Sequence, residues 1–185
     1  MEYTNAFYEQ YENYLLEDSV RVAHDWVLRI AALDAAFQNV VDFGCGTSRE
    51  FLVHAKPSKY VGIDLCDRAD IQADYRTFDL ARLPARPDAF VSLFSIEITE
   101  KDNYPFYEKV FHALPVKMGL VSGFYYAGCD EDAVDEAGGV RSYQTLEKIE
   151  NVRSSVFSEK RIILPVPSTM FGKDVIEVWK LFTRT

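Results

Sequence analysis

Two glycines that directly follow a short apolar run constrain the fold of this chain more than any other feature. The run covers residues 39–43, and its two adjacent valines favour the end of a buried strand because β-branched side chains suit a pleated surface. Gly44 and Gly46 allow a tight turn, and without a Cβ they let the backbone approach a ligand closely. Asp42 stands at the carboxyl end of the strand. The combination predicts a ligand-binding corner at the carboxyl ends of the strands of an α/β sheet.

The residues after the turn predict the start of a helix, which Thr47 or Ser48 can cap. A dinucleotide fingerprint would need a third glycine where Arg49 stands, and this replacement disfavours a nicotinamide cofactor. The chain also contains no Gly-x-x-x-x-Gly-Lys-Ser/Thr run of the kind that cradles phosphates. A nicotinamide oxidoreductase therefore has little support as the function of this corner.

A second acid ends the next predicted strand. Residues 60–65 read Tyr-Val-Gly-Ile-Asp-Leu, which places Asp64 at a strand end like that of Asp42. A carboxylate has two acceptor oxygens and can take both hydroxyls of a ribose. The pair of acids predicts a site for a ligand that carries a sugar.

The motifs Val-Val-Asp-Phe-Gly-Cys-Gly-Thr and Val-Gly-Ile-Asp-Leu resemble those of the class I S-adenosylmethionine-dependent methyltransferases. The resemblance covers roughly residues 39–127 in motif order and the rest of the chain more loosely. It implies a three-layer, Rossmann-like α/β fold whose mostly parallel, seven-stranded sheet ends in an antiparallel C-terminal hairpin strand. The family often has a further small residue, commonly glycine, where Ser48 stands.

The resemblance also implies S-adenosyl-L-methionine as the cofactor and a role for each motif. The glycine turn would wrap the methionine portion, Asp42 would hold its ammonium group, and Asp64 would hold the ribose. An acid near the third strand would bind the adenine amino group, and Asp74 and Asp79 both remain candidates. The residues assigned to the cofactor in this way are Asp42, Phe43, Gly44, Cys45, Gly46, Thr47, Asp64, Leu65, Asp74, Asp79, Phe94, Ser95, Ile96, Tyr8 and Tyr11.

Composition fits one globular domain. The chain has 185 residues, of which 48% are hydrophobic, enough for one full core. We expect N-terminal helices over residues 1–37 and an α/β core over 38–185. The polar, acidic N-terminus predicts no signal peptide, and no apolar run is long enough for a membrane span. Three scattered cysteines suit reduced thiols in a cytoplasmic protein.

The charge disfavours one class of partner. A net charge of −9 argues against nucleic acid, because binding to a phosphate backbone requires clustered Lys and Arg. The chain also lacks the Asn/Asp-Pro-Pro-Tyr/Phe run that methyltransferases acting on amino groups of nucleobases commonly carry. We therefore expect a small-molecule acceptor, with a protein acceptor as the second choice.

Residues 3–16 are rich in tyrosine at helical spacing, with Tyr8 and Tyr11 on one face. This helix either packs on the body of the domain or forms a lid over the site, a role that suits tyrosine because its ring stacks and its hydroxyl forms hydrogen bonds. The other expected helices cover residues 18–37, 103–114 and 143–150, and the other expected strands cover 71–79, 89–96, 118–127, 152–166 and 174–184.

Glu97 follows the fourth predicted strand and is the best candidate for a base that activates the acceptor; the alternative is an ordinary loop acid. The three histidines, His24, His54 and His112, lack metal-ligand spacing, so the sequence predicts no metal site. Methyl transfer from a sulfonium needs chiefly positioning and desolvation, which explains the absence of a triad. The alternative function is a cofactor-binding module without catalysis.

Overall fold

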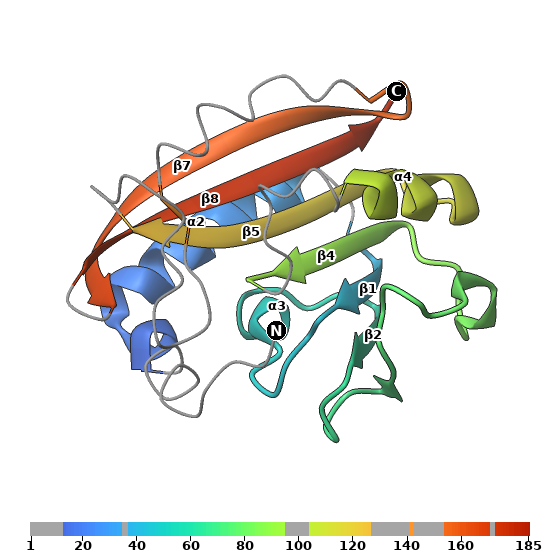
Figure 1. Ribbon diagram of the computed structural model, residues 1–185, viewed down its shortest axis with the longest axis horizontal. Coiled ribbons are helices and arrows are strands. Elements are labelled where there is room, and N and C mark those ends of the chain that lie inside the picture. Colours follow the sequence, from blue (N-terminus) through green and yellow to red (C-terminus); the bar gives the residue numbers. More distant parts are fainter. Residues whose placement is uncertain (1–12, 35–36, 95–103, 127–140, 143–153, 171–172) are drawn as a thin grey trace.

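The computed structural model describes residues 13–34, 37–94, 104–126, 141–142, 154–170 and 173–185. These residues form one sheet with helices on both of its faces (Figure 1). In chain order the elements are α2 (Asp18–Asp34), β1 (Asn39–Phe43), α3 (Glu50–His54), β2 (Lys59–Asp64), β3 (Ile71–Gln72), the 3-10 helix η1 (Leu80–Arg82), β4 (Ala89–Leu93), α4 (Tyr104–Ala113), β5 (Met118–Tyr126), β6 (Arg141–Ser142), β7 (Phe157–Met170) and β8 (Lys173–Arg184).

The sheet has the strand order β3-β2-β1-β4-β5-β8-β7, and the short β6 pairs with β5 off this path. Strands β3, β2, β1, β4 and β5 run parallel. Strand β8 is antiparallel to β5 and forms the closing hairpin with β7. Apart from the short β6, the strands form the seven-stranded mixed sheet expected from the sequence, which is confirmed together with its antiparallel C-terminal hairpin.

Each face of the sheet carries its own apolar core. On one face, α4 places Tyr107, Val110 and Phe111 against the sheet residues Phe90 and Phe182. Each of these five side chains is fully buried, and such burial contributes about 1.5–3 kcal/mol for a large apolar side chain. The ring of Phe90 lies so close to β5 that a Cβ on Gly119 would come within 2.1 Å of it. Only glycine fits at that position.

The opposite face is covered by α2 and α3. Val27 and Leu28 of α2 and Phe51 of α3 belong to the same buried cluster as Val91 of β4 and Trp179 of β8. Figure 1 shows α2 crossing behind β5 and β8. Among the described residues, no helix is both long enough and apolar enough to cross a bilayer.

The chain enters α3 differently from the sequence prediction, which had Thr47 or Ser48 as the helix cap. Arg49 occupies the N-cap position in the left-handed region at φ 47°, and no side chain caps the helix. Its guanidinium donates a hydrogen bond of 3.1 Å to Asp70 Oδ1 and another to the carbonyl oxygen of Arg68. The predicted cap is wrong because these two contacts keep Arg49 at the N-cap position, whereas Thr47 and Ser48 are exposed.

Several elements are shorter than predicted. β3 ends at Gln72 rather than near residue 79, because the chain turns at Asp74, whose carboxylate accepts a hydrogen bond of 2.9 Å from the backbone N–H of Arg76. β4 ends at Leu93, because Phe94 has φ 55° and leaves the extended conformation. α2 is described as far as Asp34, and the next two residues of the predicted helix lie outside the described residues.

The predictions for α4, β5 and the C-terminal hairpin are confirmed to within a few residues. The predicted helix over residues 143–150 lies outside the described residues. Of the tyrosine-rich helix predicted over residues 3–16, only residues 13–16 are described, and these are helical.

Candidate functional site

The carboxyl ends of β1, β2 and β4 lie side by side. β1 pairs in parallel with both neighbours, and Asp42 lies opposite Gly62 on one side and Val91 on the other. Asp42 and Asp64, which are separated in the sequence, are therefore brought to one edge of the sheet. This edge, toward which β4 and β5 point in Figure 1, is the expected place for a ligand in an α/β fold.

Asp42 is buried, and only one of its two oxygens is paired. Its Oδ2 accepts a hydrogen bond of 2.7 Å from the Tyr60 hydroxyl. Its Oδ1 is buried and has no hydrogen-bond partner among the described residues. Burial raises the pKa of Asp42 to about 7, and the charge of Asp64 adds to the increase. A buried, unpaired carboxylate oxygen needs a partner, and a cationic ligand group would supply one.

The glycine turn adopts the conformation that its sequence predicts. Gly44 and Gly46 have φ 75° and 57°, a region that residues with a Cβ rarely adopt. The Gly44 N–H donates to the carbonyl oxygen of Ile63 at 2.8 Å, which joins the turn to β2. A Cβ on Gly62 would lie 2.7 Å from the Cys45 sulfur, so that glycine lets the turn sit directly against β2.

Asp64 links β2 to the glycine turn. Its Oδ2 accepts a hydrogen bond of 3.0 Å from the N–H of Gly46, and its Oδ1 accepts one of 3.0 Å from the N–H of Cys66. These bonds fix the orientation of the carboxylate. Each carboxylate oxygen has two lone pairs, so Asp64 can still accept hydrogen bonds from a ligand.

The other predicted residues of this corner divide between the core and the surface. The Phe43 side chain is fully buried in the core, so only its backbone faces the turn. The Cys45 thiol is buried, and burial raises its pKa to about 12, which keeps it neutral. Thr47 is exposed, and Leu65 is 70% exposed.

Asp74 and Asp79 lie in different turns, and neither ends a strand. Asp74 lies directly after Ala73, whose N–H donates to the carbonyl oxygen of Asp64 at 2.9 Å. Asp79 lies further along the chain and caps η1 by accepting a hydrogen bond of 3.1 Å from the N–H of Ala81. Of the two acids, Asp74 is therefore the one whose neighbour in the chain, Ala73, is hydrogen-bonded to the carboxyl end of β2.

Phe94 is the only member of the 94–96 segment that the structure describes. Its backbone N–H donates to the carbonyl oxygen of Ser122 at 2.8 Å. Its ring stacks on His24 at a centroid distance of 5.2 Å and meets Trp179 edge-on at 5.5 Å. Ser95, Ile96 and Glu97, together with Tyr8 and Tyr11, lie outside the described residues.

Sequence reasoning missed a buried polar cluster beside Phe94. His24 Nδ1 lies 2.8 Å from Glu50 Oε1, and its Nε2 lies 2.6 Å from Glu177 Oε1. Glu177 also accepts hydrogen bonds from the Tyr14 hydroxyl and, at 2.9 Å, from the Trp179 indole. Burial alone would lower the pKa of His24, but the two glutamates outweigh it and raise the pKa to about 9. No local pattern could reveal this cluster, because His24 and Glu177 are 153 residues apart.

A second buried polar cluster lies on the face covered by α4. Lys180 Nζ donates a hydrogen bond of 2.8 Å to the Tyr104 hydroxyl, and this hydroxyl is 2.5 Å from Glu159 Oε2. Burial lowers the pKa of Lys180 to about 8 despite the nearby Glu159 carboxylate. Tyr104 is the first residue of α4, and in the sequence it directly follows residues 95–103, which include Glu97.

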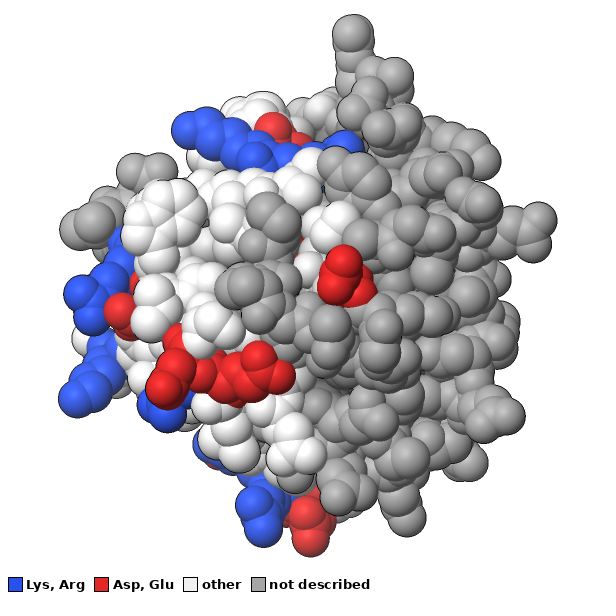
Figure 2. Space-filling model, turned by 90° about the vertical axis from the view of Figure 1, so that its left-hand side faces the viewer, with Lys and Arg blue, Asp and Glu red and all other residues white. Residues whose placement is uncertain are grey.

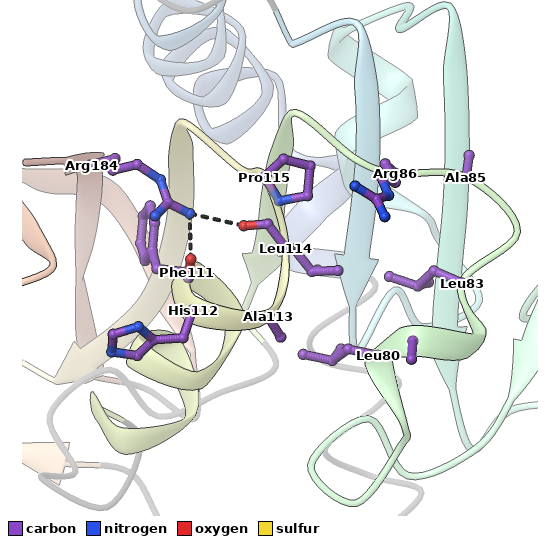
Figure 3. Close-up of a pocket in the computed structure, with 11 residues that line it drawn as sticks. Leu80, Leu83, Ala85, Arg86, Phe111, His112, Ala113, Leu114, Pro115 and Arg184 are labelled. Atoms are coloured by element: carbon purple, nitrogen blue, oxygen red, sulfur yellow. Dashed lines mark hydrogen bonds between the residues drawn. The ribbon is translucent and has the colours of Figure 1, made fainter.

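A cavity of about 470 Å³ lies between η1 and α4 (Figure 3). Arg184 borders it and donates hydrogen bonds to the carbonyl oxygens of Phe111 and Leu114 at the end of α4. Ala85 and Pro115, which precede β4 and β5, also line it. The cavity therefore lies at the amino ends of the strands, away from Asp42 and Asp64, and is not part of the candidate site.

No protein-family model matches the sequence. A search of curated proteins likewise gives no significant match. Solved structures, in contrast, match almost the whole chain. The 1,6-didemethyltoxoflavin-N1-methyltransferase of Burkholderia thailandensis, with bound 1,6-didemethyltoxoflavin and S-adenosylhomocysteine, matches with a TM-score of 0.58 at 16% identity, over 96% of this chain and 84% of that one.

Two further structures show the same likeness. The N-methyltransferase NodS of Bradyrhizobium japonicum has a TM-score of 0.57 at 13% identity, over 92% of this chain and 99% of that one. The magnesium protoporphyrin IX methyltransferase of Synechocystis, with bound S-adenosylmethionine, has a TM-score of 0.50 at 15% identity, over 100% of this chain and 86% of that one. The chain therefore has the class I fold of the S-adenosylmethionine-dependent methyltransferases.

Proposed function

We propose that this protein binds S-adenosylmethionine at the glycine turn and transfers its methyl group to a small-molecule acceptor. The observation that carries the proposal is the Asp42 carboxylate, whose buried Oδ1 has no partner among the described residues. The ammonium group of the methionine portion would pair with this oxygen. Two of the structural neighbours were solved with S-adenosylhomocysteine or S-adenosylmethionine bound, which supports the same ligand class.

The other contacts proposed for the cofactor follow from the geometry at the carboxyl ends of β1 and β2. Gly44 and Gly46 expose backbone that a ligand can approach closely. Asp64, already oriented by the N–H groups of Gly46 and Cys66, would accept hydrogen bonds from the ribose hydroxyls. Asp74 is favoured over Asp79 for the adenine amino group, because its turn is joined to the Asp64 backbone through Ala73.

The start of α3 argues against a diphosphate at the same corner. Glu50 is the first residue of this five-residue helix and is buried there. Burial alone would raise the pKa of Glu50, but its hydrogen bonds with His24 and His54 outweigh burial and lower the pKa to about 2. So short a helix offers only a weak dipole for binding an anion, and its buried first residue takes up its charge in pairing with His24 and His54. The alternative of a nicotinamide dinucleotide therefore lacks support from this geometry.

The charge on the accessible face favours a cationic ligand. Figure 2 looks onto the side toward which β4 and β5 point, and a group of Asp and Glu side chains lies near the middle of its described part, while Lys and Arg lie at the rim together with further acids. The whole chain carries a net charge of −9. Both features suit a sulfonium and an ammonium better than a phosphate.

Bound S-adenosylmethionine supplies an activated methyl group on its sulfonium, so the protein has to orient the acceptor and exclude water. Such positioning is worth about 7–11 kcal/mol of the barrier in well-oriented reactions. The backbone after β4, starting at Phe94, would flank the reacting centre. We propose that Glu97 takes the acceptor proton and that the segment with Tyr8 and Tyr11, predicted from the sequence to be helical, closes over the site.

Calorimetric titration tests the ligand class. S-adenosylhomocysteine should bind with a 1:1 stoichiometry, whereas NADH should not bind. Incubation with S-adenosylmethionine and a panel of small amines, phenols, carboxylic acids and peptides, followed by mass spectrometry, then tests the reaction. Cofactor binding without any product that is heavier by one methyl group would favour the alternative, a non-catalytic S-adenosylmethionine-binding module.

A further inference from the structure

Two histidines and one glutamate converge between α2 and α3. Glu50 Oε1 lies 2.8 Å from His24 Nδ1 and 3.0 Å from His54 Nε2, and the three ligand atoms all lie within 4.8 Å of one another. His24 comes from α2, while Glu50 and His54 lie four residues apart on one face of α3. Among the described residues, no other His, Cys, Asp and Glu side chains form such a group.

In each histidine, the ring nitrogen that does not face Glu50 points toward a second acid. His24 Nε2 lies 2.6 Å from Glu177 Oε1, and His54 Nδ1 lies 3.7 Å from Asp25 Oδ1. Metal-binding histidines typically direct their second ring nitrogen to a carboxylate, which fixes the orientation of the ring and makes the ligand more basic. His24 has that arrangement, whereas the 3.7 Å from His54 Nδ1 to Asp25 Oδ1 is an ion-pair distance that a small movement of the partly exposed Asp25 could close.

The burial and charge of the cluster also fit a divalent cation. His24 is fully buried, and the side chains of Glu50 and His54 are 8% and 5% exposed. The carboxylates of Glu50, Glu177 and Asp25 surround the two imidazoles, and Arg29 is paired with Asp25 at 2.8 Å on the outer side. Zn²⁺ would take the place of the proton that His24 holds between Glu50 and Glu177, and this proton would be released to solvent.

We propose that His24, Glu50 and His54 form a zinc site that fastens α2 to the start of α3. Two histidines and a glutamate are a known zinc ligand set that leaves a fourth position for water. Zinc–ligand bonds of about 2.0–2.1 Å place tetrahedral ligands about 3.3 Å apart. The two spacings to Glu50 Oε1, 2.8 and 3.0 Å, need to widen by only a few tenths of an ångström. His24 Nδ1 and His54 Nε2 lie within 4.8 Å of each other and would have to come to about the same separation.

The site is distinct from the proposed cofactor site, but it supports the same turn. Glu50 directly follows Arg49, which ends the glycine turn. A metal bound here would hold the first turn of α3 against α2 and so limit the movement of the turn. The proposal does not depend on methyltransferase activity, because metal binding is measured directly.

Titration of the chelator-treated full-length protein tests the proposal. Zn²⁺ should bind with 1:1 stoichiometry in calorimetry, and Co²⁺ should give the visible absorption bands of a low-coordinate site with nitrogen and oxygen ligands. At a hundredfold excess over Kd, Zn²⁺ should raise Tm by about 5–10 °C. His54→Gln should weaken binding at least tenfold, while His112→Gln, which changes the remaining histidine on the exposed side of α4, should bind like the wild type.

Two results would overturn the proposal: no saturable Zn²⁺ binding by the wild type, or undiminished binding by a folded His54→Gln variant. Either result would mean that the cluster is held by hydrogen bonds alone. If His54→Gln fails to fold, ¹⁵N NMR of the wild-type histidines decides the question. Zn²⁺ must then shift the ring nitrogens of His24 and His54 and leave those of His112 unchanged.

Discussion

The Tyr60 hydroxyl donates a hydrogen bond of 2.7 Å to Oδ2 of Asp42, and this contact orients the carboxylate while leaving Oδ1 buried and without a partner among the described residues. The tyrosine belongs to β2 and the aspartate to β1, so the strand pairing itself places the two groups together. We interpret the second oxygen as the acceptor for the ammonium group of the cofactor.

The affinity for S-adenosylhomocysteine should rise with pH. Burial raises the pKa of Asp42 to about 7 in the free protein, so the carboxyl group is partly protonated near neutral pH. An ammonium group binds the ionised form, and below this pKa the affinity should fall up to tenfold per pH unit. Calorimetry between pH 5.5 and 8.5 should show this trend in the wild type. Asp42→Asn should bind more weakly and lack the trend, and an equally steep pH profile in that variant would exclude Asp42 as its origin.

Asp64→Ala should lower cofactor affinity about ten- to a hundredfold. The change removes charge-assisted hydrogen bonds to the ribose, each worth about 1.5–3 kcal/mol, and also frees the N–H groups of Gly46 and Cys66. The matched control is Asp67→Ala, which removes an exposed acid three residues further along the chain. Equal affinities of the two variants would remove Asp64 from the site.

Gly46→Ala separates backbone strain from steric conflict. A Cβ at this position would meet no atom within 4 Å, but the residue has φ 57°. The left-handed conformation costs an L-residue about 1–2 kcal/mol, so we expect Tm to fall by about 3–6 °C. Thermal unfolding of this variant beside Ser48→Ala, which changes an exposed residue of the same turn, measures the difference. Identical melting temperatures would show that the turn relaxes without cost.

Glu97→Gln should slow methyl transfer while sparing cofactor binding. A positioned general base contributes about 10²–10⁴-fold, so turnover should fall at least a hundredfold on an acceptor found by the panel. S-adenosylhomocysteine affinity should stay within twofold of the wild type. Glu100→Gln provides the control from the same segment. Unchanged turnover in Glu97→Gln would assign the proton transfer to another group.

Local sequence rules predict the glycine corner well, because each of its features depends on a few neighbouring residues. The valines of β1 favour a strand, Gly44 and Gly46 permit positive φ, and the acids at two strand ends follow from parallel pairing. The family resemblance, rather than these local rules, predicted the mostly parallel sheet and its antiparallel C-terminal hairpin strand.

Predictions failed where side chains compete for local hydrogen bonds. The cap assigned to Thr47 or Ser48 is displaced by Arg49, whose left-handed conformation is held by contacts with Asp70 and the Arg68 carbonyl. The third strand is cut short by the turn at Asp74. Such competition depends on atoms that only the folded chain brings together.

Long-range clusters were outside the reach of sequence reasoning. His24, Glu50 and His54 have no spacing of a known metal motif, and Glu177 joins them from a strand near the C-terminus. Residues on different elements meet only after the sheet and both helices have formed. The prediction of no metal site, based on spacing alone, therefore could not take this cluster into account.

A crystal structure with S-adenosylhomocysteine tests the central claim most directly. We predict density for the ligand over Gly44 and Gly46, with its ammonium group within hydrogen-bonding distance of Asp42 Oδ1 and its ribose hydroxyls on Asp64. An empty carboxyl edge at saturating ligand, or density only in the cavity between η1 and α4, would contradict the account.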